Sequence, residues 1–316
     1  MNRKSFLKQI TPLLISLVVM GGLSLMVRKF EREAPRPFDR LIVEVLPELP
    51  DLTGRPQELI ERLELAHGNL QVGELQREAL VELAYLYHAN GFFSQAESCY
   101  LGLESFETEN PRWPYLLGIL KLDRQDQAVT ATHFARAIRL DPTHSLAYLR
   151  LGNAYLKGGL LEEAETAFEY RLLGSPRDAW GRVAMGRVSI AREDWSAARD
   201  WLEQAKDQRP ELGIVYDLLP EVYLETGDVE AAKSLRREGE ALDLVYEMSD
   251  EHLLFLQDYC YDADLLLRFA REARSQTDFD RALELLQRAV ALNLDNKDAL
   301  AELEKLIVEI EGQPPN

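Results

Sequence analysis

The sequence is poor in the residues that build metal sites, disulfides and catalytic centres. It has two cysteines in 316 residues, Cys99 and Cys260, and no C-x-x-C pair, which excludes rubredoxin-like, thioredoxin-like and haem-attachment motifs. Its five histidines show neither H-x-x-x-H nor H-E-x-x-H spacing, and neither a P-loop nor a G-x-S-x-G motif occurs. We therefore expect no metal, no cofactor, no small-molecule substrate and no enzymatic activity.

Positive charge is also scarce. The formal net charge is -18, and residues 1–34 are basic, so the remainder of the chain is more acidic still. Nucleic-acid binding depends on lysine and arginine that neutralise phosphates, so an acidic body excludes nucleic acid as the expected partner. Most of the carboxylates are expected on a solvated face, where they keep the protein soluble.

The sequence does contain a repeat. Small residues recur in steps of 34 along two ladders, namely Ala84, Gly118, Gly152 and Gly186, and then Ala96, Thr130, Ala164, Ala198 and Ala232. A fixed period of this length indicates a repeat architecture. Two antiparallel helices approach closely only where one side chain is small, so each pair of ladder positions predicts a helix–helix contact.

Glycine and proline punctuate the same period. Gly91, Gly159 and Gly227 fall between the two predicted helices of three repeats, where a turn with positive φ suits glycine. Proline closes three successive repeats because it stops a helix, at Pro142, Pro176 and Pro210. The pattern predicts helical hairpins that follow one another along the chain.

The third repeat resembles the tetratricopeptide repeat most closely, through Tyr148, Leu151, Gly152, Tyr155, Ala164, Phe168 and Pro176. The resemblance implies an all-α fold, a right-handed superhelix of helical hairpins over residues 58–312. The repeats are expected near 77–110, 111–144, 145–178, 179–212 and 213–246, with a sixth near 263–296 and a capping helix at 297–311. An insert near 240–260 is expected to add one helix, either separate or as a lengthening of a neighbour.

The fifth repeat is the least regular. Pro220 replaces the small residue that the ladder expects in the middle of a predicted helix, where it removes one backbone hydrogen bond. We expect it to kink or shorten that helix and to bend the solenoid. Degeneration of the repeat without a bend is the alternative.

The N-terminus predicts a membrane anchor. Residues 10–27 carry no charge, and 18 residues of helix approach the thickness of the hydrocarbon core. Residues 1–34 are therefore read as a basic head with one transmembrane helix, and residues 35–57, rich in proline, as a semi-rigid linker. A cleaved signal peptide is the competing reading. We expect a single-pass protein of a bacterial inner membrane with the solenoid on the extracytoplasmic side, and a cytoplasmic solenoid stays open.

The resemblance implies that the first helix of each repeat lines a concave groove that binds a protein or peptide. The candidate partner-binding residues are Tyr85, Arg112, Tyr115, Arg150, Asn153, Lys157, Trp180 and Arg187. Arg150 and Arg187 are suited to hold a carboxylate; ordinary surface ion pairs are the alternative for this basic cluster. Val81 and Tyr85 stand where chaperone-tail receptors of this family carry the first lysine and asparagine of their clamp, so chaperone-tail binding is not expected.

These observations together predict a non-catalytic, membrane-anchored scaffold that docks a partner peptide or helix in its groove. Two alternatives of other kinds stay open. One is a periplasmic assembly factor, as relatives are in cytochrome maturation or envelope biogenesis. The other is a regulatory subunit of a membrane enzyme.

Overall fold

The computed structural model describes residues 48–122, 126–242, 244–246 and 250–312. The chain divides into two units, residues 1–46 and 47–316, and the described residues belong to the second. The predicted membrane helix at 10–27 and most of the linker lie outside them. No helix within the described ranges is both long and apolar enough to cross a bilayer.

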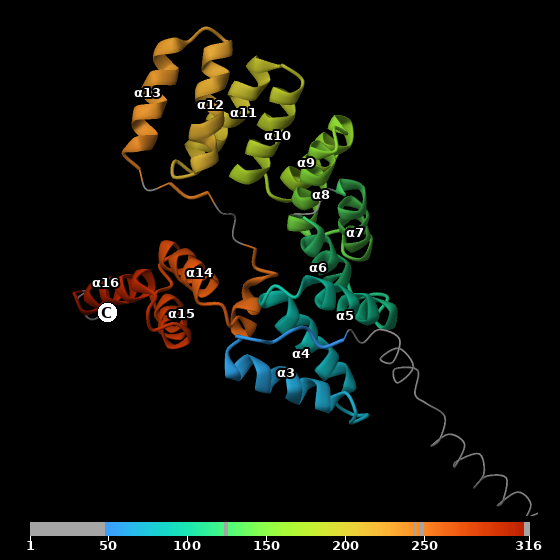
Figure 1. The fold of residues 1–316 in the computed structure, drawn as a ribbon. Coiled ribbons are helices and arrows are strands. Elements are labelled where there is room, and N and C mark those ends of the chain that lie inside the picture. Colours follow the sequence, from blue (N-terminus) through green and yellow to red (C-terminus); the bar gives the residue numbers. More distant parts are fainter. Residues whose placement is uncertain (1–47, 123–125, 243, 247–249, 313–316) are drawn as a thin grey trace, which may run out of the picture. The chain divides into compact units, whose positions relative to one another are not determined.

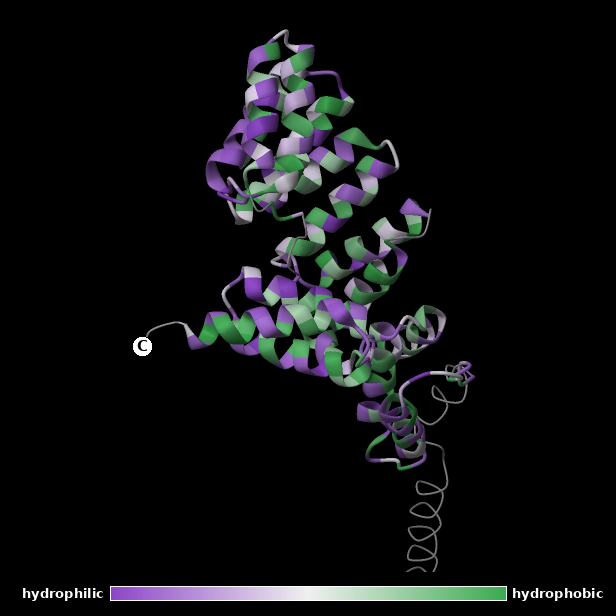
Figure 2. Ribbon diagram, turned by 60° about the vertical axis from the view of Figure 1, so that its left-hand side comes forward, coloured by the Kyte–Doolittle hydropathy of each residue, from purple (hydrophilic) through white to green (hydrophobic). Residues whose placement is uncertain are grey.

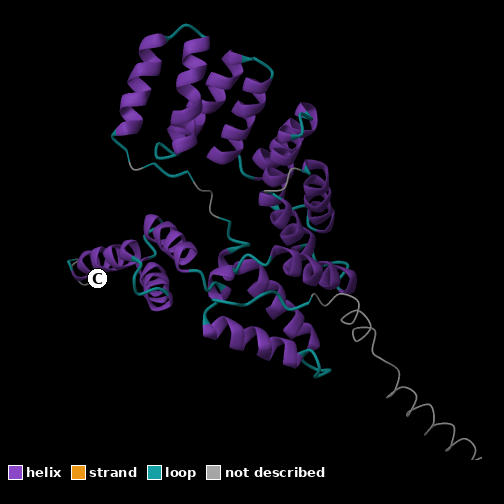
Figure 3. Ribbon diagram, in the orientation of Figure 1, coloured by secondary structure: helices purple, strands orange, loops and turns teal. Residues whose placement is uncertain are grey.

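The described part of the chain is helical, with fourteen α-helices, one 3₁₀ helix and no β-strand (Figures 1 and 3). The helices are α3 (Gln57–Asn69), α4 (Gln76–Ala89), α5 (Phe93–Phe106), α6 (Arg112–Lys121), α7 (Gln127–Leu140), α8 (Ser145–Lys157), α9 (Leu161–Gly174), α10 (Ala179–Ala191), α11 (Trp195–Gln208), α12 (Gly213–Glu225), α13 (Val229–Glu240), η1 (Leu254–Tyr259), α14 (Ala263–Ser275), α15 (Phe279–Leu292) and α16 (Lys297–Glu311).

Consecutive helices pack as hairpins. The pairs are α4 with α5, α6 with α7, α8 with α9, α10 with α11, α12 with α13, and α14 with α15. Helix α3 packs on α4, and α16 packs on α15. Figure 2 shows hydrophobic and hydrophilic residues interspersed along each helix, as expected for helices that bury one face against their neighbours. This confirms an all-helical repeat solenoid.

The small-residue ladder marks the helix crossings. A Cβ atom added to Gly118 would lie 2.7 Å from the Phe134 ring, and one added to Gly186 would lie 2.9 Å from the Leu202 side chain. Gly152 meets the fully buried Phe168 in the same way. The second helix therefore places a large side chain against the glycine of the first, and even a methyl group there would force the helices apart.

The turns and caps follow the period too. Gly91, Gly159 and Gly227 have φ of 82°, 77° and 84°, which confirms the predicted positive-φ turns. The second helices α7, α11, α13 and α15 each begin after an aspartate whose carboxylate accepts a hydrogen bond from the backbone N–H three residues on, namely Asp126, Asp194, Asp228 and Asp278. These caps satisfy donors that a helix start otherwise leaves unpaired.

Two expectations need correction. Pro220 lies inside α12, yet α12 has 13 residues, as α8 and α10 have, so the proline does not shorten the helix. The insert is not an additional α-helix. Where described, residues 241–262, which we call the return segment, are turns and non-helical chain followed by the short 3₁₀ helix η1. The reason is tertiary, because this segment binds the surface of the preceding repeats instead of bonding to itself.

Candidate functional site

The first helices α4, α6, α8, α10 and α12 carry the predicted groove residues, and the described part of the return segment contacts α12, then α6 and α8, and then α4. We call the surface of these five helices that faces the return segment the groove surface. The return segment passes the repeats in reverse order: Val245 lies at the start of α12, Asp250 at α6 and α8, and Tyr259 at α4. In Figure 1 it leaves α13 and ends beside α4.

The first contact is with the fifth repeat. The Val245 N–H donates to the Glu211 carbonyl at 2.7 Å, and the Val245 carbonyl accepts from the Gly213 N–H at 2.9 Å, which makes an isolated parallel bridge. The Tyr246 ring lies directly on Gly213, where a Cβ atom would approach it to 2.5 Å. Gly213 thus allows the return segment to approach α12 closely.

Asp250 makes the central polar contact between the return segment and the groove surface. Its carboxylate accepts a hydrogen bond from the Tyr115 hydroxyl at 2.5 Å and one from Arg150 Nη2 at 3.2 Å. The Asp250 residue is only 6 % exposed. Burial, followed by the neighbouring Asp250 charge, raises the pKa of Tyr115 far above its ordinary value, so this hydroxyl stays protonated and donates.

A histidine pair lies next to this carboxylate. The His252 ring of the return segment is 4.1 Å from the His144 ring, and His144 is 4.4 Å from the Tyr115 ring. His144 also caps α8 by accepting from the Ala147 N–H. Burial, followed by the nearby His252, lowers the pKa of His144 to about 4. His144 is therefore neutral at pH 7, which its role as a cap acceptor requires.

Aromatic rings of η1 cover the first repeat. Phe255 and Tyr259 lie 4.4 and 5.2 Å from the Tyr85 ring. Arg112 donates to the Tyr85 hydroxyl at 3.1 Å and lies over the Phe255 ring at 5.5 Å. Offset and edge contacts of this kind add to the burial of apolar area.

The backbone of the return segment is also bound. Asn90 donates to the Tyr259 carbonyl at 2.7 Å and accepts from the Tyr261 N–H at 2.8 Å. Arg62 of α3 donates to the Asp258 carbonyl at 3.1 Å and lies over the Tyr259 ring at 4.6 Å. One asparagine thus pairs with both the acceptor and the donor of an incoming chain, as the edge of a strand would.

The other side of η1 is held by the sixth repeat. Arg281 of α15 donates to the Asp258 carboxylate at 2.6 Å, and Arg288 donates to the carbonyls of Gln257 and Cys260 at 2.9 and 2.8 Å. Cys260 is fully buried, and both cysteines are free thiols. The return segment therefore joins the groove surface to α15.

Between α8 and α10 the groove stays open. A cavity of about 280 Å³ is lined by Leu149, Arg150, Asn153, Trp180, Val183, Ala184, Arg187, Ile214 and Tyr246. Arg187 is partly buried there and donates to the Asn153 side-chain carbonyl at 3.1 Å, and burial lowers its pKa. It forms no ion pair with any residue that the structure describes. Arg150 Nε is also buried without a hydrogen-bond partner among these residues.

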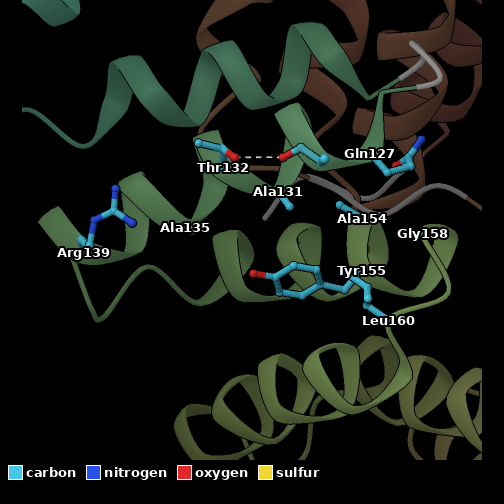
Figure 4. A pocket seen from close by; sticks show the side chains of 10 residues that line it. Gln127, Ala131, Thr132, Ala135, Arg139, Ala154, Tyr155, Gly158 and Leu160 are labelled. Atoms are coloured by element: carbon cyan, nitrogen blue, oxygen red, sulfur yellow. Dashed lines mark hydrogen bonds between the residues drawn. The ribbon is translucent and has the colours of Figure 1, made fainter.

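A second cavity, of about 380 Å³, lies between α7 and α8. Figure 4 shows the Tyr155 ring extending beneath Ala131 and Ala135, with Arg139 at one end. The dashed bond in that view joins the Thr132 hydroxyl to the Ala128 carbonyl one turn earlier. This hollow is walled mainly by small side chains and follows from the spacing of two adjacent helices.

The eight predicted residues separate into three groups. Tyr85, Arg112, Tyr115 and Arg150 contact the return segment, Asn153, Trp180 and Arg187 line the open cavity together with Arg150, and Lys157 is exposed at the end of α8. Sequence reasoning missed Arg62, Asn90 and His144. Asn90 precedes the turn glycine Gly91, and nothing local in the sequence shows that a chain arrives there from residue 259.

Comparison with known proteins supports an assignment to the tetratricopeptide repeats over part of the chain. The tetratricopeptide-repeat family model matches residues 115–181 and 267–303. A tetratricopeptide repeat protein from Parabacteroides merdae has a similar structure, with 16 % identity and a TM-score of 0.53, over 86 % of this chain and 98 % of that one. At this identity the likeness shows the fold alone.

Looser structural matches include a MamA double mutant (20 % identity, TM-score 0.49, 52 % of this chain and 92 % of that one). Another is PilF of Pseudomonas aeruginosa (13 % identity, TM-score 0.47, 72 % of this chain and 97 % of that one). No curated protein sequence matches the chain. The chain is built from tetratricopeptide repeats, as its 34-residue period predicts.

Proposed function

We propose that this protein is a non-catalytic, membrane-anchored scaffold that holds an acidic segment of a partner protein in the open cavity between α8 and α10. Tetratricopeptide solenoids present extended surfaces for binding other proteins. The observation that carries the proposal is Arg187, which faces a cavity and, among the residues that the structure describes, donates a hydrogen bond only to an amide oxygen.

The chemistry of the cavity favours a carboxylate. Leu149, Val183 and Ile214 supply apolar walls, which lower the local dielectric constant and strengthen any ion pair formed inside. A planar guanidinium binds a carboxylate through two parallel hydrogen bonds. The chain as a whole has a net charge of -18, so this cationic cavity distinguishes one place on the surface from its acidic surroundings.

The anchor is assigned to residues 10–27, an uncharged run between basic residues, with the solenoid on the extracytoplasmic side of a bacterial inner membrane. Full-length protein is expected to stay in membranes washed at alkaline pH, and external protease is expected to digest the solenoid in spheroplasts. Release by the alkaline wash, or complete protection of the solenoid, would overturn this placement.

The binding role is tested by capture of partner proteins on the full-length chain from detergent-solubilised membranes, with quantitative mass spectrometry. Arg187→Gln is expected to reduce the main captured protein at least tenfold. The matched control is Arg199→Gln, which removes the same charge from α11, where Arg199 lies in weak contact with Glu203 at 4.0 Å. Equal capture by both variants would contradict the proposal.

A further inference from the structure

We propose that the return segment is an internal ligand of the groove surface, and that a partner protein binds α4, α6 and α8 by displacing it with a segment of the same chemistry. That chemistry is one carboxylate followed five and nine residues later by aromatic side chains, as in Asp250, Phe255 and Tyr259. The inference rests on the proposed function in one respect, that the groove binds protein segments, but it concerns a different part of the groove.

The return segment is recognised as a peptide would be. Its three side chains use two sites: Asp250 binds Tyr115 and Arg150, and the Phe255 and Tyr259 rings share Tyr85. Its backbone is read by Asn90 through one donor and one acceptor. Main-chain hydrogen bonds of this kind give affinity for any chain, and the side-chain sites select the sequence.

The surface beneath the segment has the composition of an interface. Tyr85 and Tyr115 are 5 % and 1 % exposed with the segment in place, and both carry a polar tip on an apolar ring. Tyrosine and arginine are the residues that concentrate in binding surfaces, because they are apolar on one part and hydrogen-bond on another. Tyr115 packs on Phe134 within the core of the repeats, and this contact does not involve the return segment, so a partner can replace the segment without repacking it.

The charges also favour exchange over permanent packing. Asp250 and Arg150 are both removed from water to form their contact, and a buried ion pair gains little net stability over an apolar pair of the same volume. Breaking such a pair is costly only if one charge is left alone. A competing carboxylate takes over the bonds to Tyr115 and Arg150 one for one, whereas an uncharged segment does not.

The C-terminal helices carry the segment as one body. Helices α14, α15 and α16 pack on each other, and Arg281 and Arg288 attach η1 to α15. The main packing of this body on the earlier helices is that of η1 on α4. Release of the return segment therefore separates residues 250–311 from the groove surface while their own core stays intact.

The test uses a fluorescein-labelled synthetic peptide of residues 250–262 and full-length protein, with fluorescence anisotropy as the readout. The double variant Asp250→Asn with Phe255→Ala weakens the internal ligand and is expected to bind the peptide at least tenfold more tightly than the wild-type chain does. A peptide that itself carries Asp250→Asn is expected to bind this variant about tenfold more weakly. Equal binding by wild type and variant, or binding by neither, would overturn the inference.

Further variants test whether the effect comes from loss of fold, and light scattering tests whether a second copy of the chain occupies the groove surface. Leu254→Ala changes an exposed residue of η1 that is 40 % accessible, and it is expected to behave as wild type. Adding Tyr115→Phe to the double variant is expected to weaken peptide binding, with unchanged helical content by circular dichroism.

Light scattering measures the oligomeric state of both proteins. If the wild type is a dimer and the double variant is not, the groove surface binds a second copy of the chain and the partner assignment is overturned. Arg187→Gln is expected to leave peptide binding unchanged, which separates this test from that of the proposed function.

Discussion

Tyr85 and Arg187 occupy the same position of the 34-residue period, three repeats apart, yet their surroundings are opposite. Tyr85 on α4 is covered by Phe255 and Tyr259 of the return segment, and 5 % of it is exposed. Arg187 on α10 faces an open cavity and, within the described part of the chain, bonds only to the neutral amide of Asn153. The repeat determines the direction in which a side chain points, and the chain that arrives from elsewhere determines whether that side chain is covered.

The largest effect on the free energy of unfolding is expected at the filled end of the groove surface, by which we mean the part around α4 that the return segment covers. Tyr85→Ala removes a ring in contact with Phe255, Tyr259, Tyr100 and Trp113, so it leaves a cavity and uncovers η1. Loss of a buried aromatic side chain costs about 3–5 kcal/mol in free energy of unfolding. Urea unfolding followed by circular dichroism measures the change. Lys157→Ala, at an exposed position, is the control and is expected to stay within about 0.5 kcal/mol. A Tyr85→Ala protein as stable as this control would remove the distinction between the two ends.

A change of pH is expected to have an intermediate effect on the free energy of unfolding, again at the filled end. Burial lowers the pKa of His88 on α4 to about 4, and His88 bonds to the Tyr100 hydroxyl. An unfolded histidine titrates near its ordinary pKa of 6.5, so between these values the unfolded chain binds more protons than the folded one. Stability is therefore complete above pH 6.5 and falls as the pH decreases toward 4.

At pH 5 the loss from His88 is about 2 kcal/mol, since one pKa unit corresponds to about 1.4 kcal/mol. Urea midpoints at pH 7 and pH 5 measure it, and His144, whose pKa is lowered in the same direction, adds to it. His88→Gln keeps a hydrogen-bonding group beside Tyr100 and is expected to reduce the difference between the two midpoints. An unchanged or larger difference in this variant would show that other groups cause the pH dependence.

The smallest effect on the free energy of unfolding is expected at the open cavity between α8 and α10. Arg187→Met replaces a partly desolvated guanidinium, which pairs with no described carboxylate, by an apolar side chain of similar length. Removing an uncompensated charge from an apolar site offsets the lost hydrogen bond to Asn153, so the free energy of unfolding is expected to change by less than about 1 kcal/mol. The same urea experiment measures it. A loss above about 2 kcal/mol would mean that Arg187 supports the fold and is not held ready for a ligand.

The ladder was predictable because its cause is local and repeated. Gly118 and Gly186 are small since a large side chain of the next helix crosses them, and that constraint returns with every hairpin. The turn glycines were predictable for a similar reason, because positive φ penalises a Cβ atom wherever the turn recurs. In the fourth and sixth repeats, however, Glu193 and Thr277 take positive φ without glycine, so the turn persists where its sequence signal is missing.

The return segment was not predictable in the same way. Asp250–Arg274 contains no helix breaker, and its apolar and charged residues suit a helix as well as a chain bound to a surface. The bond from Asn90 to Tyr259 joins residues 169 positions apart, and neither residue carries a local sign of it. The predicted groove residues Tyr85, Arg112, Tyr115 and Arg150 contact the return segment of their own chain in this structure, and their role in binding a partner stays a prediction.

The sequence by itself determined the period, the hairpins and the helix faces, because close packing and turn geometry place the same residue types at the same steps along the chain. Only the tertiary structure decided which part of the groove is filled. That outcome depends on the sum of many weak contacts between residues far apart in sequence. Whether residues 241–262 form their own helix or bind the groove surface is decided only once the helices that form that surface have folded.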